Sequence, residues 1–350
     1  MTGRPRRTFK VLAILLSVGG AGGVLLGADL YLHHRAERSA GLNRWGYRGP
    51  VVGAKRPGET RIVMLGGSTV FGYGVFWDQA IPAVLERELR QADPTHPVSV
   101  INLGFNNEGA FALVPTLRDF AYLDPDVAIF YAGYNEGFGD LGPNTAVYRH
   151  ESPVFRAFGY FPILPLVLRE KAVALRTGGQ LVASDNATAQ RTAKPVFSPN
   201  LAERTSAGAL EAMTKISETM SAPLNWIARR PPEPGAPPSA GCAYPWVSYC
   251  ASLFQAISYA RGEGLDVVVA WPPLMTGDNR KRHEEQQAAA AAMVAQKFSS
   301  DSRVRSVDLS HAVDLADRHL SFDGMHLDQD GNAVIAQALA APLRTVLVAR

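Results

Sequence analysis

The stretch that decides the fold is residues 61–68, RIVMLGGS. Arg61 to Leu65 is a short, mostly apolar run, and it stops at Gly66 and Gly67, where the chain can turn sharply because neither residue carries a Cβ. A run of this length that ends in a tight turn indicates a strand buried on both faces. Ser68 would then stand at the carboxyl end of that strand.

Four further segments have the same strand-like character. Val98 to Leu103 and Val127 to Tyr131 follow early in the chain, and Asp266 to Trp271 and Val304 to Leu309 follow late. Each segment is short and rich in apolar residues, as expected of strands that are covered on both faces.

Segments with helical spacing lie between these strands. Strands and helices that take turns predict a parallel sheet with helices on both faces, a three-layer α/β/α fold around five strands. The active site of such a sheet lies at the carboxyl ends of its strands. The predicted helices are one that Asp78 caps, with Ile81, Leu85 and Leu89 recurring every four residues, and residues 113–120, 253–261, 284–298 and 332–339.

Residues 11–32 are apolar enough to cross a membrane, and Asp29 is the only charged residue among them. A helix needs about 20 residues to cross the hydrocarbon core. Four cations within residues 1–10 precede the run, and such a flank stays in the cytoplasm. We therefore predict a cytoplasmic segment at 1–10, a transmembrane signal-anchor at 11–32, and the remainder of the chain outside.

A cleaved signal peptide is the alternative to this anchor. Its apolar region spans about 7 to 15 residues before a small-residue cleavage site, and no such site follows Leu26, so we favour an uncleaved anchor. Gly19, Gly23 and Gly27 fall four apart and could pack against a second helix, which would allow self-association. A glycine-rich segment without a partner explains the same spacing.

Two regions lie outside the strand–helix alternation. The polar and basic residues 33–60 are interpreted as a stalk that leads into the folded domain at 61–345. Residues 141–242 are interpreted as an insertion, which begins with apolar and aromatic residues and ends in a proline-rich linker at 229–241. The apolar part could form a lid, rest on the membrane or pack against the core.

Charge and cysteine content limit the partners. The 35 Lys and Arg residues nearly balance the 32 Asp and Glu residues, and no basic stripe indicates a nucleic-acid partner. Cys242 and Cys250 are close in the sequence and could form a disulfide in an oxidising compartment. No cysteine or histidine has the spacing of a metal site, and we expect neither a metal nor a cofactor.

Ser68 is a candidate nucleophile only if a base can take its proton. The segment SFDGMHLDQDGN, residues 321–332, offers one, because Asp323 and His326 are three residues apart in a glycine-containing loop. The carboxylate can hold one ring nitrogen while the other faces outward, as in a catalytic triad. Each residue alone also has an ordinary explanation, a turn serine and a solvated loop histidine.

Two further strand ends offer donors for an oxyanion. Gly104 follows the second strand in INLGFNN, where its backbone N–H can point into the site. Asn135 follows the third strand in YAGYNE and has a side-chain amide. A turn glycine and a loop asparagine are the structural alternatives.

The joint order of these residues resembles the SGNH (GDSL-like) hydrolase superfamily, whose four blocks contain Ser, Gly, Asn and His. The resemblance covers about residues 61–140 and 248–343, and it implies a flavodoxin-like α/β fold. By resemblance, Ser68 is the nucleophile, His326 the general base and Asp323 its orienting carboxylate. The oxyanion hole would comprise the N–H groups of Ser68 and Gly104 and the side chain of Asn135.

One departure from the family pattern lies in the first block, which reads GGST where the namesake motif has Asp before Ser. The preceding NRWGYRGP, residues 43–50, resembles a segment found ahead of GGST blocks in bacterial members with an N-terminal anchor. This resemblance implies a single-pass protein of the bacterial cytoplasmic membrane whose catalytic domain is extracytoplasmic.

The expected function is a serine esterase that acts on an O-acyl ester of the cell envelope. An O-acetylated glycan is the first choice of substrate, and a lipid ester is the second because of the apolar insertion. Glu136 and Trp271 are candidates for contact with substrate, although a solvated carboxylate and a packed indole are the alternatives. An O-acyltransferase with the same triad and a catalytically silent envelope scaffold remain alternative functions.

Overall fold

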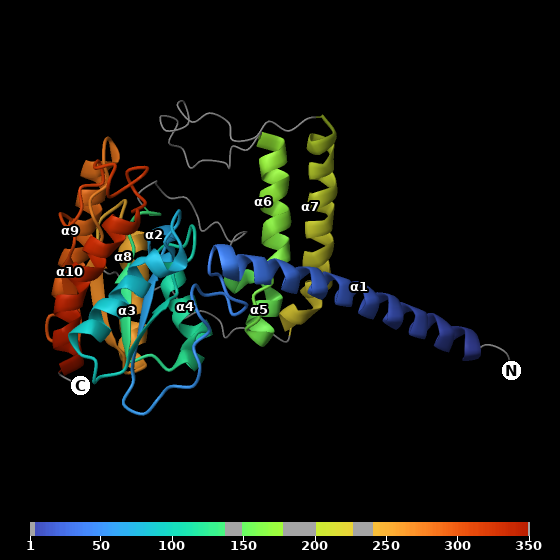
Figure 1. The fold of residues 1–350 in the computed structure, drawn as a ribbon, viewed down its shortest axis with the longest axis horizontal. Helices are drawn as coiled ribbons and strands as arrows, with labels where there is room; N and C mark the ends of the chain where they lie inside the picture. The colour runs from blue at the N-terminus through green and yellow to red at the C-terminus, as the bar shows by residue number, and fades with distance from the viewer. Residues whose placement is uncertain (1–3, 137–148, 178–200, 227–240, 349–350) are drawn as a thin grey trace. The chain divides into compact units, whose positions relative to one another are not determined.

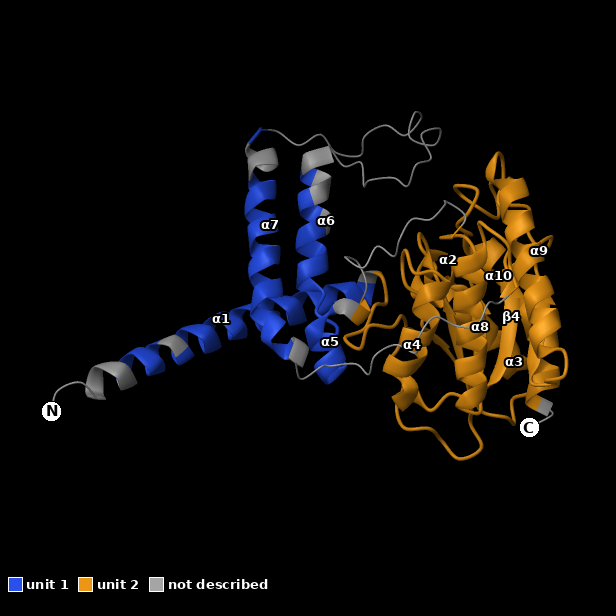
Figure 2. Ribbon diagram, turned by 180° about the vertical axis from the view of Figure 1, so that it is seen from behind, with its two compact units in different colours: residues 1–38, 152–229 blue, residues 39–151, 230–350 orange. Residues whose placement is uncertain are grey.

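The computed structural model describes residues 4–136, 149–177, 201–226 and 241–348. The chain forms two compact units, which Figure 2 distinguishes by colour. One unit comprises residues 39–151 and 230–350 and contains the sheet. The other comprises residues 1–38 and 152–229 and is helical.

The sheet unit is built on five parallel strands in the order β2-β1-β3-β4-β5, which confirms the predicted five-stranded parallel sheet. All residues of the first four strands are buried, as their apolar sequences predict, whereas β5 at the edge is partly exposed. The strands are β1 (Thr60–Gly66), β2 (Val98–Asn102), β3 (Val127–Tyr131), β4 (Asp266–Trp271) and β5 (Val304–Asp308).

Helices cover both faces of the sheet (Figure 1). On one face, α3 (Ile81–Ala92) and α10 (Gln329–Val348) pack on alternate strand residues such as Ile62 and Ile129. The other layer contains α4 (Leu113–Asp119), α8 (Val247–Gly262) and α9 (Asn279–Phe298). The strand order brings the end of β1 between its neighbours β2 and β3, so residues that follow these three strands meet at one edge of the sheet.

The start of α3 differs from the sequence prediction. Asp78 does not cap the helix, because it lies in the short 3-10 turn η1 (Trp77–Gln79) and α3 begins after Ala80, whose backbone is extended. Pro82 in the first turn has a fixed φ that suits a helix start, and this replaces the capping side chain.

The predicted stalk at 33–60 is wrong. Residues up to Ser39 continue the N-terminal helix α1 (Arg4–Ser39), and the next residues pack into the sheet unit. Tyr47 is 1% exposed and Arg48 is 4% exposed, and the Arg48 N–H donates to Asn102 O at the end of β2 (3.1 Å). A basic segment is expected in solvent, but the Arg48 guanidinium is buried because backbone carbonyls satisfy it.

The helical unit contains α1, α5 (Pro153–Phe158), α6 (Leu164–Thr177) and α7 (Leu201–Ser221). Figure 1 shows α6 and α7 side by side, and the two helices pack on each other. The described residues 152–177 and 201–226 of the predicted insertion therefore group with α1 as one unit, whereas its described residues 149–151 and 241–242 belong to the sheet unit. Residues 137–148, 178–200 and 227–240, which include most of the proline-rich linker, lie outside the described residues.

Helix α1 is long and apolar enough to cross a membrane. Its stretch from Phe9 to Arg38 has 30 residues and contains an 18-residue window with a mean hydropathy of 2.2, none of which is buried. A signal sequence near the N-terminus can meet the same criteria of length and hydropathy, so these properties establish an apolar N-terminal helix that is either a membrane span or a signal sequence.

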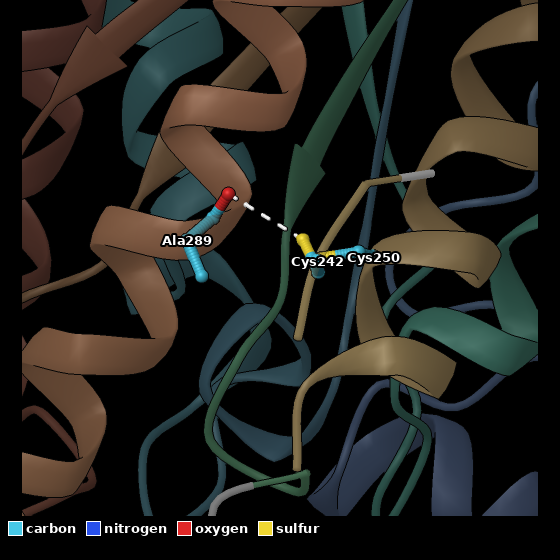
Figure 3. The surroundings of a disulfide bond; sticks show 3 residues. All are labelled: Cys242, Cys250 and Ala289. Carbon is cyan, nitrogen blue, oxygen red and sulfur yellow. Dashed lines mark hydrogen bonds between the residues drawn. A yellow bond between two sulfur atoms is a disulfide. The ribbon is translucent and has the colours of Figure 1, made fainter. Parts of the chain in front are cut away.

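A disulfide joins Cys242 to Cys250, with 6.2 Å between their Cα atoms. Cys250 is fully buried on α8, whereas Cys242 lies in the loop that precedes this helix. Figure 3 shows the bond beside α9, where the Cys242 Sγ lies 3.5 Å from Ala289 O. The bond therefore ties the loop before α8 to that helix.

Candidate active site

Ser68 lies immediately beyond the carboxyl end of β1, as the first residue of the short helix α2 (Ser68–Phe71). The two residues before it must be glycines, because other groups of the protein approach their Cα atoms too closely to leave room for a Cβ. A Cβ at Gly66 would collide with Tyr131 O, and a Cβ at Gly67 would lie 2.5 Å from Asn135 Nδ2. The turn that presents the Ser68 hydroxyl therefore tolerates no side chain at either position.

His326 bridges Ser68 and Asp323. Its Nε2 lies 2.8 Å from Ser68 Oγ, and its Nδ1 lies 2.6 Å from Asp323 Oδ2. The carboxylate selects the tautomer with the proton on Nδ1, which leaves Nε2 free to accept the hydroxyl proton. Residues that are 258 positions apart in the chain thus form a serine, a base and an orienting acid in hydrogen-bonding contact.

The loop around His326 holds the pair in place. Asp323 Oδ1 accepts the backbone N–H groups of Met325 (3.0 Å) and His326 (2.7 Å). The buried Ser321 donates its hydroxyl to His326 O at 2.9 Å. Burial raises the pKa of Asp323, but the hydrogen bonds and charge of His326 outweigh it and lower the pKa below its ordinary value. The carboxylate is therefore charged at neutral pH.

Two aromatic side chains contact the histidine ring and each other, and sequence reasoning missed both. The Tyr73 ring lies 4.9 Å from the His326 ring, and the Phe322 ring stacks on it at 5.7 Å. Both aromatic side chains are partly exposed, at 42% and 39%. The signals were present in the sequence, since Phe322 adjoins Asp323 and Tyr73 stands between two glycines of positive φ.

The predicted oxyanion donors are only partly arranged around Ser68. Ser68 is the first residue of α2, and the first N–H groups of a helix have no intrahelical carbonyl to bond, so the Ser68 N–H is not used by the helix. The Asn135 amide lies against Gly67 and gives one hydrogen to Glu108 O (2.6 Å), which leaves a second hydrogen on Nδ2. Two of the three predicted groups therefore retain a hydrogen that an oxyanion could accept.

Gly104 differs from its predicted role. Its N–H donates to Asn102 Oδ1 at 3.0 Å, and Asn102 in turn donates to Val70 O at 2.9 Å. A Cβ on Gly104 would lie 2.5 Å from the Phe71 nitrogen. In this structure the glycine therefore admits α2 close to β2, and its only N–H is already used.

Glu136 and Trp271, the predicted substrate contacts, are turned to the protein. The Glu136 carboxylate accepts the Ala110 N–H, and burial raises its pKa although that hydrogen bond opposes the shift. Trp271 ends β4 and is only 5% exposed. The first residue braces the loop after β2, and the second packs in the interior.

Two buried arginines support the loops of the site, and sequence reasoning did not identify them. Arg48 donates to the carbonyls of Phe71, Gly72 and Val75, which flank Tyr73. Arg149 is fully buried and donates to Leu103 O (2.6 Å) and to Glu108 (3.3 Å). Arg48 therefore holds the loop after α2, and Arg149 holds the loop after β2.

A cavity of about 640 Å³ in the sheet unit lies along the edge of β2, lined by residues such as Arg48, Trp77 and Val100, and not by Ser68 or His326. Within the described ranges, no group of three His, Cys, Asp or Glu side chains could hold a metal ion. The chemistry available to the described site is that of its hydroxyl, imidazole and carboxylate.

No protein-family model and no curated protein matches the sequence. Solved structures similar to the chain include a protein described as lipolytic, of the G-D-S-L family, from Desulfitobacterium hafniense (13% identity, TM-score 0.41, 81% of this chain and 98% of that one). Others are an acetylxylan esterase from Geobacillus stearothermophilus (11%, 0.42, 80% and 92%) and a lipase/acylhydrolase from Enterococcus faecalis (14%, 0.43, 82% and 96%). With TM-scores below 0.5 the similarity is distant.

Proposed function

We propose that the chain is a serine ester hydrolase with Ser68 as its nucleophile. The observation that carries the proposal is the continuous contact from Ser68 Oγ to His326 Nε2 (2.8 Å) and from His326 Nδ1 to Asp323 Oδ2 (2.6 Å). A hydroxyl is hardly nucleophilic at neutral pH unless a base takes its proton, and this arrangement provides that base.

In the first step Ser68 Oγ attacks the ester carbonyl carbon while its proton moves to His326 Nε2. The carbonyl oxygen becomes an oxyanion, for which the Ser68 N–H and the second hydrogen of the Asn135 amide are the candidate donors. The Gly104 N–H can join them only after it leaves Asn102 Oδ1. His326 then gives its proton to the departing alcohol, which leaves an acyl group on Ser68.

In the second step a water molecule attacks the acyl carbon and loses its proton to His326 Nε2; the bond from the acyl carbon to Ser68 Oγ then breaks, and His326 gives that proton to Oγ, which releases the acid and restores Ser68. The exposure of the site supports water as the acceptor, since Asp323 is 37% exposed and Tyr73 is 42% exposed. An O-acyltransferase would use the same residues with a sugar hydroxyl in place of water. A catalytically silent scaffold would need none of them.

The proposed substrate is an O-acetyl ester of a cell-envelope glycan. Tyr73 and Phe322 support a glycan over a lipid, because exposed rings beside the reacting centre suit the apolar faces of a sugar ring. The proposed location is outside the cytoplasmic membrane, with α1 as an uncleaved anchor. The contacts of Asp29 with Tyr160 and Leu164 support retention of α1, since cleavage would remove a residue that is 4% exposed.

The test is hydrolysis of p-nitrophenyl acetate by the full chain in detergent. We expect Ser68→Ala and His326→Ala to lower kcat on the order of 10⁴-fold. His319→Ala is the matched control, because His319 is an exposed histidine of the same region without a contact to Ser68. Full activity in Ser68→Ala would overturn the proposal.

A second assay separates hydrolase from transferase. With an O-acetylated oligosaccharide as substrate, the proposed hydrolase releases free acetate whether or not a second sugar is present. Acetylated acceptor with little free acetate would show that the same triad serves a transferase. Activity in neither assay would favour the silent scaffold.

A further inference from the structure

Helix α1 is clamped to the rest of its unit at the end of its apolar run. Asp29 accepts the Leu164 N–H at 2.6 Å and the Tyr160 hydroxyl, and His33 Nε2 donates to Phe161 O at 2.6 Å. The two α1 side chains are 4% and 3% exposed. Residues 160–164 are therefore fixed at the level where the apolar part of α1 ends.

Helix α6 begins at this clamp, because Leu164 is its first residue. Figures 1 and 2 show that α6 and α7 run across the direction of α1. In both views α7 lies on the side of α6 that is nearer to the N-terminus of α1. If α1 crosses a bilayer, its N-terminal part is the embedded one, so α7 is the helix of the pair that is nearer to the lipid.

One face of α7 is exposed and uncharged. Ala207 and Thr214 are buried in the contact with α6, and Glu218 on the charged side pairs with Arg169 of α6 (2.6 Å). The remaining face carries Met213 at 47% and Ile216 at 56% exposure. We call this face the α7 stripe; its members are Ala209, Ala212, Met213, Ile216 and Met220, all exposed and spaced at helical intervals.

Exposed aromatic residues lie beside the clamp. Tyr31 on α1 is 62% exposed, two residues after Asp29, and Phe158 is 63% exposed, two residues before Tyr160. Tyrosine and tryptophan side chains gather where a bilayer meets water, and the exposed Phe158 adds apolar surface beside the clamp. Because these residues adjoin the clamp, we infer that the membrane surface lies at the level of Asp29 and of Leu164, the first residue of α6.

We propose that the α7 stripe rests on the lipid surface beside the point where α1 leaves the bilayer. The inference rests on the membrane anchor of the proposed function, and it adds a second, in-plane contact with lipid. A helix with one apolar face and one charged face lies in the interface with its apolar side chains among the acyl chains. Met213, Ile216 and Met220 supply that face, whereas the helical spacing places Lys215 and Glu218 outside it, and Glu218 pairs with Arg169 of α6.

The experiment measures contact with lipid at single positions of the full chain. Because the two cysteines of the chain form a disulfide, an introduced cysteine is the only free thiol. Ile216→Cys, Lys215→Cys and Val24→Cys are each labelled with an environment-sensitive fluorophore and reconstituted in phosphatidylethanolamine–phosphatidylglycerol vesicles that contain nitroxide-labelled acyl chains. Val24 is the reference, since it lies within the apolar run of α1.

We expect the label at 216 to be quenched severalfold more than the label at 215, and the label at 24 to be quenched most. Equal quenching at 216 and 215 would overturn the proposal, and so would fluorescence at 216 that depends on protein concentration, because a second copy would then cover the stripe. An unquenched label at 24 would contradict both the membrane anchor and the proposal that rests on it. Hydrolysis of p-nitrophenyl acetate, measured on the same samples, reports separately on the esterase.

Discussion

His326 is held in one orientation before any substrate arrives. Its backbone carbonyl accepts from Ser321, its backbone N–H donates to Asp323, and its ring contacts those of Tyr73 and Phe322. The loop is closed by a bridge between Ser321 and Leu327. A base fixed in this way loses little freedom when it takes the Ser68 proton, which favours a fast first step.

The stability that Asp323 contributes depends on pH. Burial raises the pKa of this carboxyl, but its hydrogen bonds to His326 lower it below the ordinary value, so the folded-state pKa lies below the unfolded one. The contribution is thus complete above the unfolded pKa of about 4 and is lost as pH falls through the folded pKa.

We therefore expect Asp323→Asn to lower the free energy of unfolding at pH 7, and the gap from the parent chain to close in acid. Urea unfolding of the parent and the variant at several pH values between 7 and the acid limit checks this. Asp317→Asn is the control, since Asp317 is an exposed aspartate of the same region. A gap that stays constant in acid would contradict the expectation.

At the scale of elements, the strands were predictable because burial on both faces leaves a continuous apolar signal. Val127 to Tyr131 and Asp266 to Trp271 were predicted with their observed bounds. The segment 40–60 was not predictable, because a buried arginine looks like a solvated one until its carbonyl partners are known. Gly104 illustrates the same limit, since only the fold shows that Asn102 takes its N–H.

Residues 40–50 act as a brace for the loop after α2. The Arg48 guanidinium donates to Ala40 O and to three carbonyls of the loop 71–75, and it lies over the Phe71 ring at 4.5 Å. Burial lowers the pKa of Arg48 to about 10, although the nearby charge of Asp78 acts to raise it. The guanidinium therefore remains charged at neutral pH. Tyr73, at the centre of this loop, is thereby held beside His326.

We expect Arg48→Lys to lower the free energy of unfolding by about 2 to 4 kcal/mol, because a single ammonium cannot reach the carbonyls that the planar fork joins. Activity toward p-nitrophenyl acetate should fall as well, since the loop with Tyr73 loses its support. Arg44→Lys is the matched control, because Arg44 is exposed in the same segment. Urea unfolding and kcat check both parts, and equal effects of the two variants would contradict the role of Arg48.

At the scale of the whole molecule, the proposed active site and the apolar helix α1 belong to different units. Ser68, Asp323 and His326 all belong to the sheet unit, whereas the apolar helix and the described part of the insertion belong to the other. The sequence distinguished the sheet from the insertion by the loss of alternation. The sequence did not show that the insertion groups with α1. That link depends on hydrogen bonds that Asp29 and His33 form with residues that lie 120 or more positions later in the chain.

This link predicts that a change in α1 loosens the insertion and leaves the esterase intact. Without the His33 side chain, Phe161 O loses its donor in a buried position, and the described residues 152–177 and 201–226 should be cleaved several times faster by protease in membranes. His34→Ala is the matched control, since His34 is the exposed neighbour. Hydrolysis of p-nitrophenyl acetate should not change, because the proposed site lies in the other unit. Equal cleavage of His33→Ala and His34→Ala would mean that the clamp does not hold the insertion to α1.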